Sequence, residues 1–255
     1  MADWVGLIAP DLSIGFAALL IGASFFTSAL TAAFGIGGGL ALMAIMGLVM
    51  PVATLIPVHG LIQLGSNSGR AWTLRKNIDF TALIPFMVGG LIAALMASRV
   101  VIALPDDWLK AALGIFVIII TWVNVPVLGG KANGVMTVGG FITTGLTMFL
   151  GATGPLVIAL FAKRFAERIT LVATAALAMV FQHAVKVMAF SLLGFAFAPW
   201  APLIGAMIAT GYAGTLIGVR LLAAFEEGRF RFWFKILLTS LGAMMVIRSV
   251  FALLA

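Results

Sequence analysis

Three polar residues, Gln182, His183 and Lys186, interrupt an apolar stretch at spacings that place them on one face of an α-helix. If that helix crosses a membrane, a lysine near its middle costs a few kcal/mol to insert unless it is paired or faces water. Its ammonium group could then bind an anion. The alternative is that the long side chain of Lys186 reaches the membrane interface, since it stands about five residues from the end of the segment.

A matching stripe occurs in the first half of the chain, where His59, Gln63, Asn67 and Arg70 recur at spacings of four, four and three. Arg70 is explained more simply as the start of a loop, and His59 as a side chain that hydrogen-bonds a neighbouring carbonyl near the outer face. Gln63 and Asn67 lie deeper in the segment. We expect His59, Gln63 and Asn67 to face the same site as the first group.

Two glycine-rich breaks, GIGGG at 35–39 and GATGP at 151–155, each precede a short apolar run. A helix that begins at such a break presents free N–H groups and the positive end of its dipole, which favour an anion, and glycine lets the anion approach the backbone. The alternative is that the glycines only allow tight helix packing. A dinucleotide-binding motif fits poorly, because the spacing differs and no soluble strand precedes it. The candidate binding residues in the two breaks are Gly35, Gly37, Gly38, Gly39, Gly151, Thr153 and Gly154.

The composition indicates an integral membrane protein. Of the 255 residues, 63% are hydrophobic and only 9% are charged, and the mean hydropathy is +1.23, which excludes a soluble domain of this length. No basic run exceeds two residues, so the net charge of +7 indicates membrane topology and not nucleic-acid binding. The absence of cysteine excludes disulfides and thiolate metal sites.

The chain divides into two series of apolar segments, and a spanning helix needs about 20 such residues. No cationic region precedes the first segment, so we expect a retained helix and not a signal peptide. The chain is expected to be a single transmembrane domain over 1–255, with repeat 1 at about 12–127 and repeat 2 at about 134–253. The expected segments are 12–34, 37–50, 52–69, 80–98 and 109–127, followed by 134–151, 154–162, 169–191, 200–223 and 234–253.

The two series resemble each other in order and content. Both begin with a glycine-rich break, and later in each half a glycine and an arginine lie nine residues apart, at Gly90 and Arg99 and at Gly211 and Arg220. We predict an all-α inverted repeat in which each half is a broken re-entrant helix pair, 12–50 or 134–162, plus three spanning helices. An odd number of crossings gives the halves opposite orientations, as in secondary transporters.

The basic residues then fix the orientation. In this arrangement eleven of the fifteen lysines and arginines share one side, which the positive-inside rule assigns to the cytoplasm. Both termini are therefore predicted to be periplasmic, in the multi-pass manner of a bacterial inner-membrane protein. The eleven residues are Arg70, Arg75, Lys76, Lys131, Lys163, Arg164, Arg168, Arg220, Arg229, Arg231 and Lys235.

Enzymatic activity is not expected. All eight carboxylates fall in the N-terminal segment, in loops or near the ends of spans, so no buried acid pair is predicted to hold a metal or to relay protons. No serine or cysteine nucleophile lies beside a histidine and an acid in a recognisable motif. The sequence predicts no cofactor and no metal.

The sequence resembles the sulfite exporter TauE/SafE family. The resemblance rests on FGIGGG at 34–39 with its short apolar run and Pro51, on the second copy GATGPLVIALF at 151–161, and on the paired glycine-to-arginine helices. It implies movement of sulfite, sulfonates or related sulfur-containing anions across the bacterial inner membrane, usually outward. The second copy departs from the pattern, because Ala152, Thr153, Gly154 and Pro155 replace the glycine run and no proline closes its short helix.

We therefore expect a transporter, most simply an exporter, of a small anion bound between the two glycine-rich breaks near the bilayer midplane. A channel with a fixed re-entrant pore is the main alternative, because glycine-rich re-entrant pairs suit it equally. A membrane enzyme or a scaffold for another complex is a weaker one. The expected partners are the small anion and the lipid bilayer, without nucleic acid, and a homo-oligomer is left open.

Overall fold

A computed structural model of the chain describes residues 9–10, 12–34, 37–97, 105–123, 132–221 and 227–254. Over these residues the protein is entirely helical, as predicted, and carries no strand. The helices are α1 (Ile14–Phe34), α2 (Gly38–Gly47), α3 (Val52–Thr73), α4 (Phe80–Ala97), α5 (Asp106–Trp122), α6 (Asn133–Leu150), α7 (Gly154–Ala162), α8 (Arg168–Leu192), α9 (Ala201–Leu221) and α10 (Glu227–Leu254), with short 3₁₀ turns at Arg75–Asn77 and Ala198–Trp200.

Five of the described helices are long and apolar enough to cross a membrane: α1, α6, α8, α9 and α10. The breaks expected before 37 and 154 are present, and the short helices α2 and α7 follow them. Helix ends differ most from expectation at α3, α5 and α10. Each extends beyond the apolar segment into charged residues, because backbone hydrogen bonding continues where hydropathy falls. Asp106 and Asp107 stand in the first turn of α5, where carboxylates interact favourably with the helix dipole.

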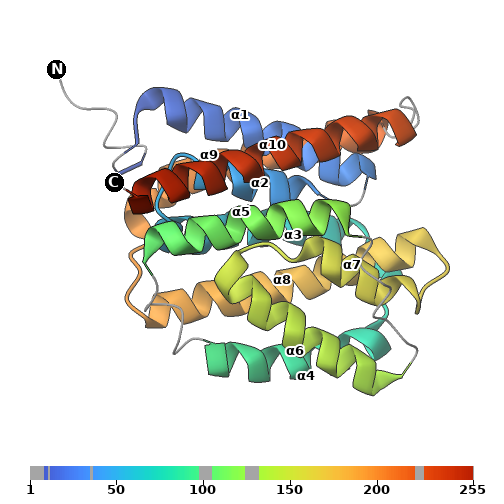
Figure 1. The fold of residues 1–255 in the computed structure, drawn as a ribbon. Coiled ribbons are helices and arrows are strands. Elements are labelled where there is room, and N and C mark those ends of the chain that lie inside the picture. The colour runs from blue at the N-terminus through green and yellow to red at the C-terminus, as the bar shows by residue number, and fades with distance from the viewer. Residues whose placement is uncertain are drawn as a thin grey trace.

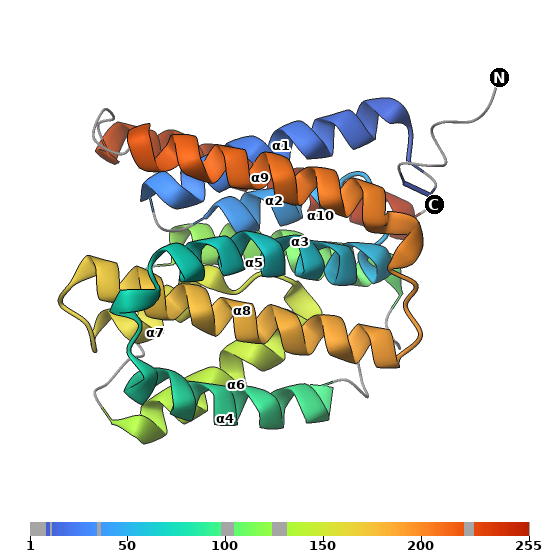
Figure 2. The same cartoon turned by 180° about the vertical axis from the view of Figure 1, so that it is seen from behind.

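The helices run side by side in one bundle (Figures 1 and 2). The most extensive pairings are α1 with α9, α4 with α6, α5 with α10, and α3 with α8. Glycines allow several of these backbones to touch. A side chain at Gly214 or Gly218 of α9 would overlap the carbonyls of Phe25 or Ala29 on α1, and one at Gly89 of α4 would overlap that of Thr137 on α6. Such contacts are a main source of helix association in lipid.

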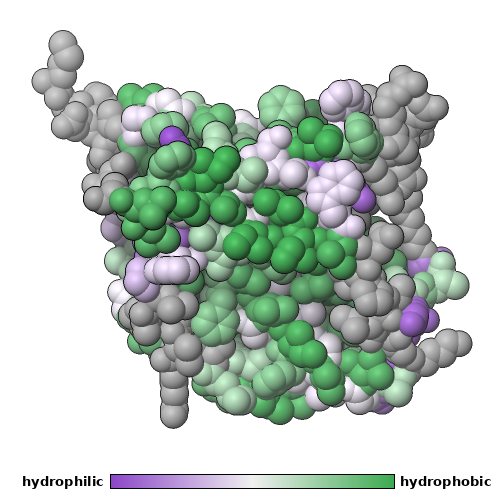
Figure 3. All heavy atoms as spheres, viewed as in Figure 1, coloured by the Kyte–Doolittle hydropathy of each residue, from purple (hydrophilic) through white to green (hydrophobic). Residues whose placement is uncertain are grey.

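The helix ends gather at two opposite ends of the bundle. The start of α1, the start of α3 and the end of α10 lie at one end, and the end of α3, the end of α7 and the start of α10 lie at the other (Figures 1 and 2). The second end, called the basic end below, carries the 3₁₀ turn with Arg75 and Lys76 and the α7–α8 connection with Lys163 and Arg164. Between the two ends, hydrophobic residues cover most of the described surface on the face shown in Figure 3.

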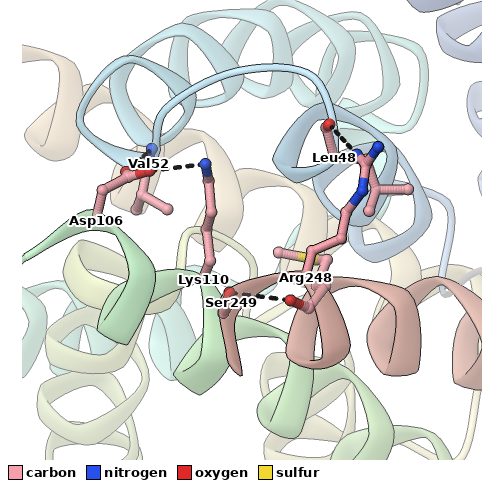
Figure 4. Close-up of polar contacts among 7 residues, drawn as sticks. Leu48, Val52, Asp106, Lys110, Arg248 and Ser249 are labelled. Atoms are coloured by element: carbon pink, nitrogen blue, oxygen red, sulfur yellow. Dashed lines mark hydrogen bonds and ion pairs between the residues drawn. The ribbon is translucent and has the colours of Figure 1, made fainter. Parts of the chain in front are cut away.

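At the end opposite the basic end, α5 and α10 hold the connection between α2 and α3 (Figure 4). The backbone N–H of Val52 donates to Asp106 Oδ1 at 2.6 Å, and the other oxygen of Asp106 pairs with Lys110 Nζ at 2.7 Å. Arg248 Nη1 donates to the Leu48 carbonyl at 3.0 Å. These contacts fix the end of α2 and the start of α3 against the longer helices.

Candidate functional site

Each helix break contains a glycine whose backbone angle few other residues adopt. Gly37, just before α2, has φ of +99°, and Gly151, just after α6, has φ of +78°. This left-handed region favours glycine because a Cβ would be strained there. Gly35, also predicted to bind substrate, lies outside the described residues. The breaks therefore separate α1 from α2 and α6 from α7, and α2 and α7 begin among buried residues of the bundle.

A cavity of about 40 Å³ lies between the two breaks and the facing polar stripes of α3 and α8. Its walls come from α1, α2, α3, the 151–153 segment, α7 and α8. Nine of the residues that the sequence nominated line it: Gly37, Gly39, His59, Gln63, Asn67, Thr153, Gly154, Gln182 and His183. The other lining residues are Thr31, Leu40, Arg70, Ala152, Pro155 and Met179.

Among the described residues, three that the sequence predicted to bind substrate do not line the cavity. Gly38 packs against α1, where an added Cβ would overlap the Thr27 carbonyl, so the packing interpretation holds at Gly38. Gly151 and Lys186 lie beside the cavity and contact each other. Lys186 Nζ donates to the Gly151 carbonyl at 2.9 Å.

Lys186 is fully buried. The interpretation in which its side chain reaches the membrane interface is therefore wrong. It points across the bundle at α3, where a Cβ on Gly60 would lie only 2.6 Å from Lys186 Cε. The small residue on α3 makes room for the lysine, and the ammonium group reaches the carbonyl that ends α6.

The two histidines meet between α3 and α8. Their ring centroids are 6.2 Å apart in an edge-to-face arrangement, and both side chains are buried. His59 Nε2 lies 3.0 Å from the Gly39 carbonyl, which can only accept, so this nitrogen carries the hydrogen. His59 thus bonds a neighbouring carbonyl, as the simpler interpretation proposed, but that carbonyl belongs to the first helix break.

Threonines of α6 complete the second polar stripe. Gln182 Nε2 donates to Thr143 Oγ1 at 3.0 Å and to Thr144 Oγ1 at 3.1 Å. Thr153 Oγ1, in the second break, donates to the Thr143 carbonyl at 3.2 Å. Sequence reasoning did not nominate Thr143 or Thr144. The sequence signal that could have identified them is a pair of adjacent hydroxyl side chains inside the predicted segment 134–151.

Arg70 was interpreted as the start of a loop, and that interpretation is wrong. Helix α3 continues to Thr73, so Arg70 stays on the helix, is only 8% exposed and lines the cavity. Arg70 Nη1 donates to Asn67 Oδ1 at 3.1 Å, and Asn67 Nδ2 donates to the Gln63 carbonyl at 2.9 Å. The regular spacing from His59 to Arg70 was the signal that could have identified it.

Unpartnered polar atoms concentrate at this cavity. Among the described residues, the buried side-chain nitrogens without a hydrogen-bond partner are His59 Nδ1, Arg70 Nε and His183 Nδ1. All three residues line the cavity. Buried polar groups normally have partners, so a cluster of exceptions calls for an explanation such as a ligand.

A comparison with protein families decides the class of the protein. The profile of the sulfite exporter TauE/SafE family matches residues 20–245, nearly the whole chain. The chain belongs to the sulfite exporter TauE/SafE family. TauE/SafE proteins are membrane transporters of sulfur-containing anions and are not enzymes. No curated protein and no solved structure matches the chain.

Proposed function

We propose that this TauE/SafE protein exports a small sulfur-containing anion, such as sulfite or an organosulfonate, and binds it between the two helix breaks near the bilayer midplane. The observation that carries the proposal is the single cavity to which both breaks and the polar faces of α3 and α8 contribute. Broken helices that meet at a central cavity are typical of secondary transporters.

The size and polarity of the cavity favour a small anion. A buried water needs about 10–15 Å³, so about 40 Å³ holds roughly three waters, or one anion of about four heavy atoms. Helices α2 and α7 begin at the cavity, with Gly37 and Gly39 on one side and Gly154 on the other. Free N–H groups and dipoles at such helix starts favour negative charge. Sulfite fits this space better than a sulfonate with an organic tail.

The pairing of helices supports an inverted repeat. If α1 to α5 correspond to α6 to α10, the pair α1–α9 maps onto α6–α4, while α3–α8 and α5–α10 each map onto themselves. These are the four principal pairings in the bundle. In the proposed transport cycle the two equivalent parts rock about the central cavity and expose it to each side in turn.

The charge distribution supports the proposed orientation of the chain in the membrane. The basic end carries Arg75, Lys76, Lys163, Arg164 and Lys235, and the opposite end carries Lys110 and Arg248. We assign the basic end to the cytoplasm. Both termini are then periplasmic, and the protein lies in the bacterial inner membrane.

Counterflow in proteoliposomes tests the proposal against a fixed-pore channel. A carrier accelerates uptake of ³⁵S-labelled sulfite when unlabelled sulfite is inside, because the loaded site returns faster than the empty one. An open pore gives no such acceleration. Uptake that is independent of internal sulfite favours the channel, and the absence of any protein-dependent uptake of sulfite, thiosulfate or small sulfonates rejects the proposed function.

A further inference from the structure

Among the described residues, no carboxylate forms an ion pair with the buried cation Arg70. It lies in the last turns of α3 at the basic end and is 8% exposed. Within the described part of the chain, the ion pair that forms is between Lys110 and Asp106, at the opposite end of the bundle. A guanidinium group stays charged in proteins, and an unpaired buried charge is strongly unfavourable. The described part of the chain therefore supplies no ion-pair partner for Arg70.

The side chain of Arg70 is held in place but keeps donors free. Nη1 donates to Asn67 Oδ1 at 3.1 Å, and Asn67 is in turn held by Gln63, since Nδ2 donates to the Gln63 carbonyl at 2.9 Å and lies 3.3 Å from Gln63 Oε1. Nε is buried and has no partner. The chain of amides therefore orients the guanidinium against the wall of the cavity and leaves N–H groups for a further acceptor.

We propose that Arg70 supplies the counter-charge of the transported oxyanion and forms a loading site at the cytoplasmic end of the cavity. This inference rests on the proposed function and adds a residue and a selectivity to it. A guanidinium presents N–H groups in a planar fork that matches two oxygens of one oxyanion. A halide offers no second acceptor, so the site prefers oxyanions such as sulfite over chloride.

The loading site is separate from the histidines. Arg70 follows His59 by eleven residues, so their backbones lie about 16 Å apart along the axis of α3, while the guanidinium group lies beside Asn67. Gln63 and Asn67 lie between them, and all four residues line the cavity. An anion captured by Arg70 would pass the two amides before it reaches the histidines and the glycines of the breaks.

The test compares Arg70→Gln and Arg70→Lys with Arg75→Gln as the matched control. Arg75 carries the same charge at the same end, but its guanidinium lies over the exposed Trp72 ring at 4.6 Å, and Arg75 does not line the cavity. Binding of sulfite, methanesulfonate and chloride is measured by calorimetry on the full-length protein in uncharged nanodiscs. Charge-assisted hydrogen bonds predict about 10- to 100-fold weaker sulfite binding for Arg70→Gln. Arg75→Gln is expected to bind within about twofold of wild type, because it changes only screened surface charge.

The lysine variant adds a readout that a purely structural role would not change. Arg70→Lys keeps the charge and loses the fork, so its preference for sulfite over chloride falls while chloride affinity changes little. If Arg70→Gln does not fold, the ratio of sulfite affinity to chloride affinity in Arg70→Lys tests the proposal. A ratio equal to that of wild type overturns it.

Three outcomes separate the inference from the function on which it rests. Sulfite binding by Arg70→Gln within about twofold of wild type overturns the role of Arg70 and leaves the transporter intact. No oxyanion binding and no counterflow by wild type overturn both. Sulfite binding that does not depend on Arg70, together with weaker binding of phosphatidylglycerol by Arg70→Gln than by wild type, assigns Arg70 to a lipid phosphate and overturns the loading site.

Discussion

Lys186 joins the second helix break to the centre of the bundle. Its ammonium group is the donor to the Gly151 carbonyl, and glutamine in its place is too short to reach that carbonyl and carries no charge. We predict that Lys186→Gln still inserts and folds but binds sulfite at least about tenfold more weakly, because a charge-assisted hydrogen bond is lost at the break. Calorimetry on the purified protein measures this, with Lys163→Gln in the exposed α7–α8 connection as control. Wild-type affinity in Lys186→Gln would show that the lysine serves packing alone.

The spacing of polar residues predicted much of the candidate site. Helical periodicity alone grouped His59, Gln63 and Asn67, and it grouped Gln182 and His183 with Lys186. Arg70 was missed because hydropathy falls before the helix ends.

Hydroxyls and long-range contacts were harder to predict. Thr143 donates to the Gly139 carbonyl of its own helix at 2.7 Å, as a threonine in any helix can, so the two adjacent hydroxyls did not by themselves indicate that they contact Gln182. The contact of Lys186 with Gly151 depends on packing across Gly60, which one-dimensional spacing does not encode.

At the scale of elements, the packing of α2 on α1 depends on Gly38. An alanine methyl group there would overlap the Thr27 carbonyl of α1, and backbone cannot move aside as a flexible side chain can. We predict that Gly38→Ala lowers the free energy of unfolding by about 3 kcal/mol and abolishes counterflow. Gly22→Ala on α1 is the control, because an added Cβ meets nothing within 4 Å. Thermal unfolding followed by size-exclusion chromatography measures both variants, and equal melting temperatures would contradict the packing role.

The start of α4 at the basic end depends on an ionised carboxylate. Asp79 Oδ1 accepts hydrogen bonds from the Thr81 hydroxyl and the Ala82 N–H. Partial burial alone raises the pKa of Asp79, but these hydrogen bonds and the positive charge of Arg164 lower it overall, below the ordinary 3.8. A lowered pKa means that this stabilisation is present above the unfolded-state value and is lost as pH falls through the folded-state value.

We therefore predict that the melting temperature of Asp79→Asn falls less than that of wild type as the pH drops from about 5 to about 3, the range in which carboxyl groups titrate. Asparagine keeps the capping geometry but does not titrate. Asp107→Asn, at the opposite end of the bundle, is expected to retain the wild-type fall. An identical pH dependence in Asp79→Asn and wild type would show that other carboxylates govern acid unfolding.

At the scale of the whole molecule, the proposed topology predicts the driving force. Moving one negative charge out of a cell held at 100 mV, inside negative, is favourable by about 2.3 kcal/mol, which corresponds to nearly a fiftyfold gradient. None of the residues that line the cavity is a carboxylate. We predict electrogenic efflux that needs no coupling ion, with His59 and His183 at most modulating its pH dependence.

Proteoliposomes under a potassium potential set by valinomycin measure this. The initial rate of sulfite flux is expected to rise with the size of the potential and to reverse its preferred direction with the sign. A rate that ignores the potential but follows an imposed proton or sodium gradient would reject uniport. If the rate follows the proton gradient, His59 and His183 become the candidate proton-binding groups.

The pairing of helices has a consequence for how the protein is made. Helix α1 leaves the ribosome well before its main partner α9, and Ser24 Oγ donates to the Met207 carbonyl at 2.6 Å across that pair. Likewise, α5 is synthesised before α10, its main packing partner. The order of synthesis therefore differs from the order of packing. Helices α1 and α5 stay without their main partners, and Ser24 without its acceptor on α9, until α9 and α10 are synthesised. A nascent chain released before α9 is a natural target for membrane proteases.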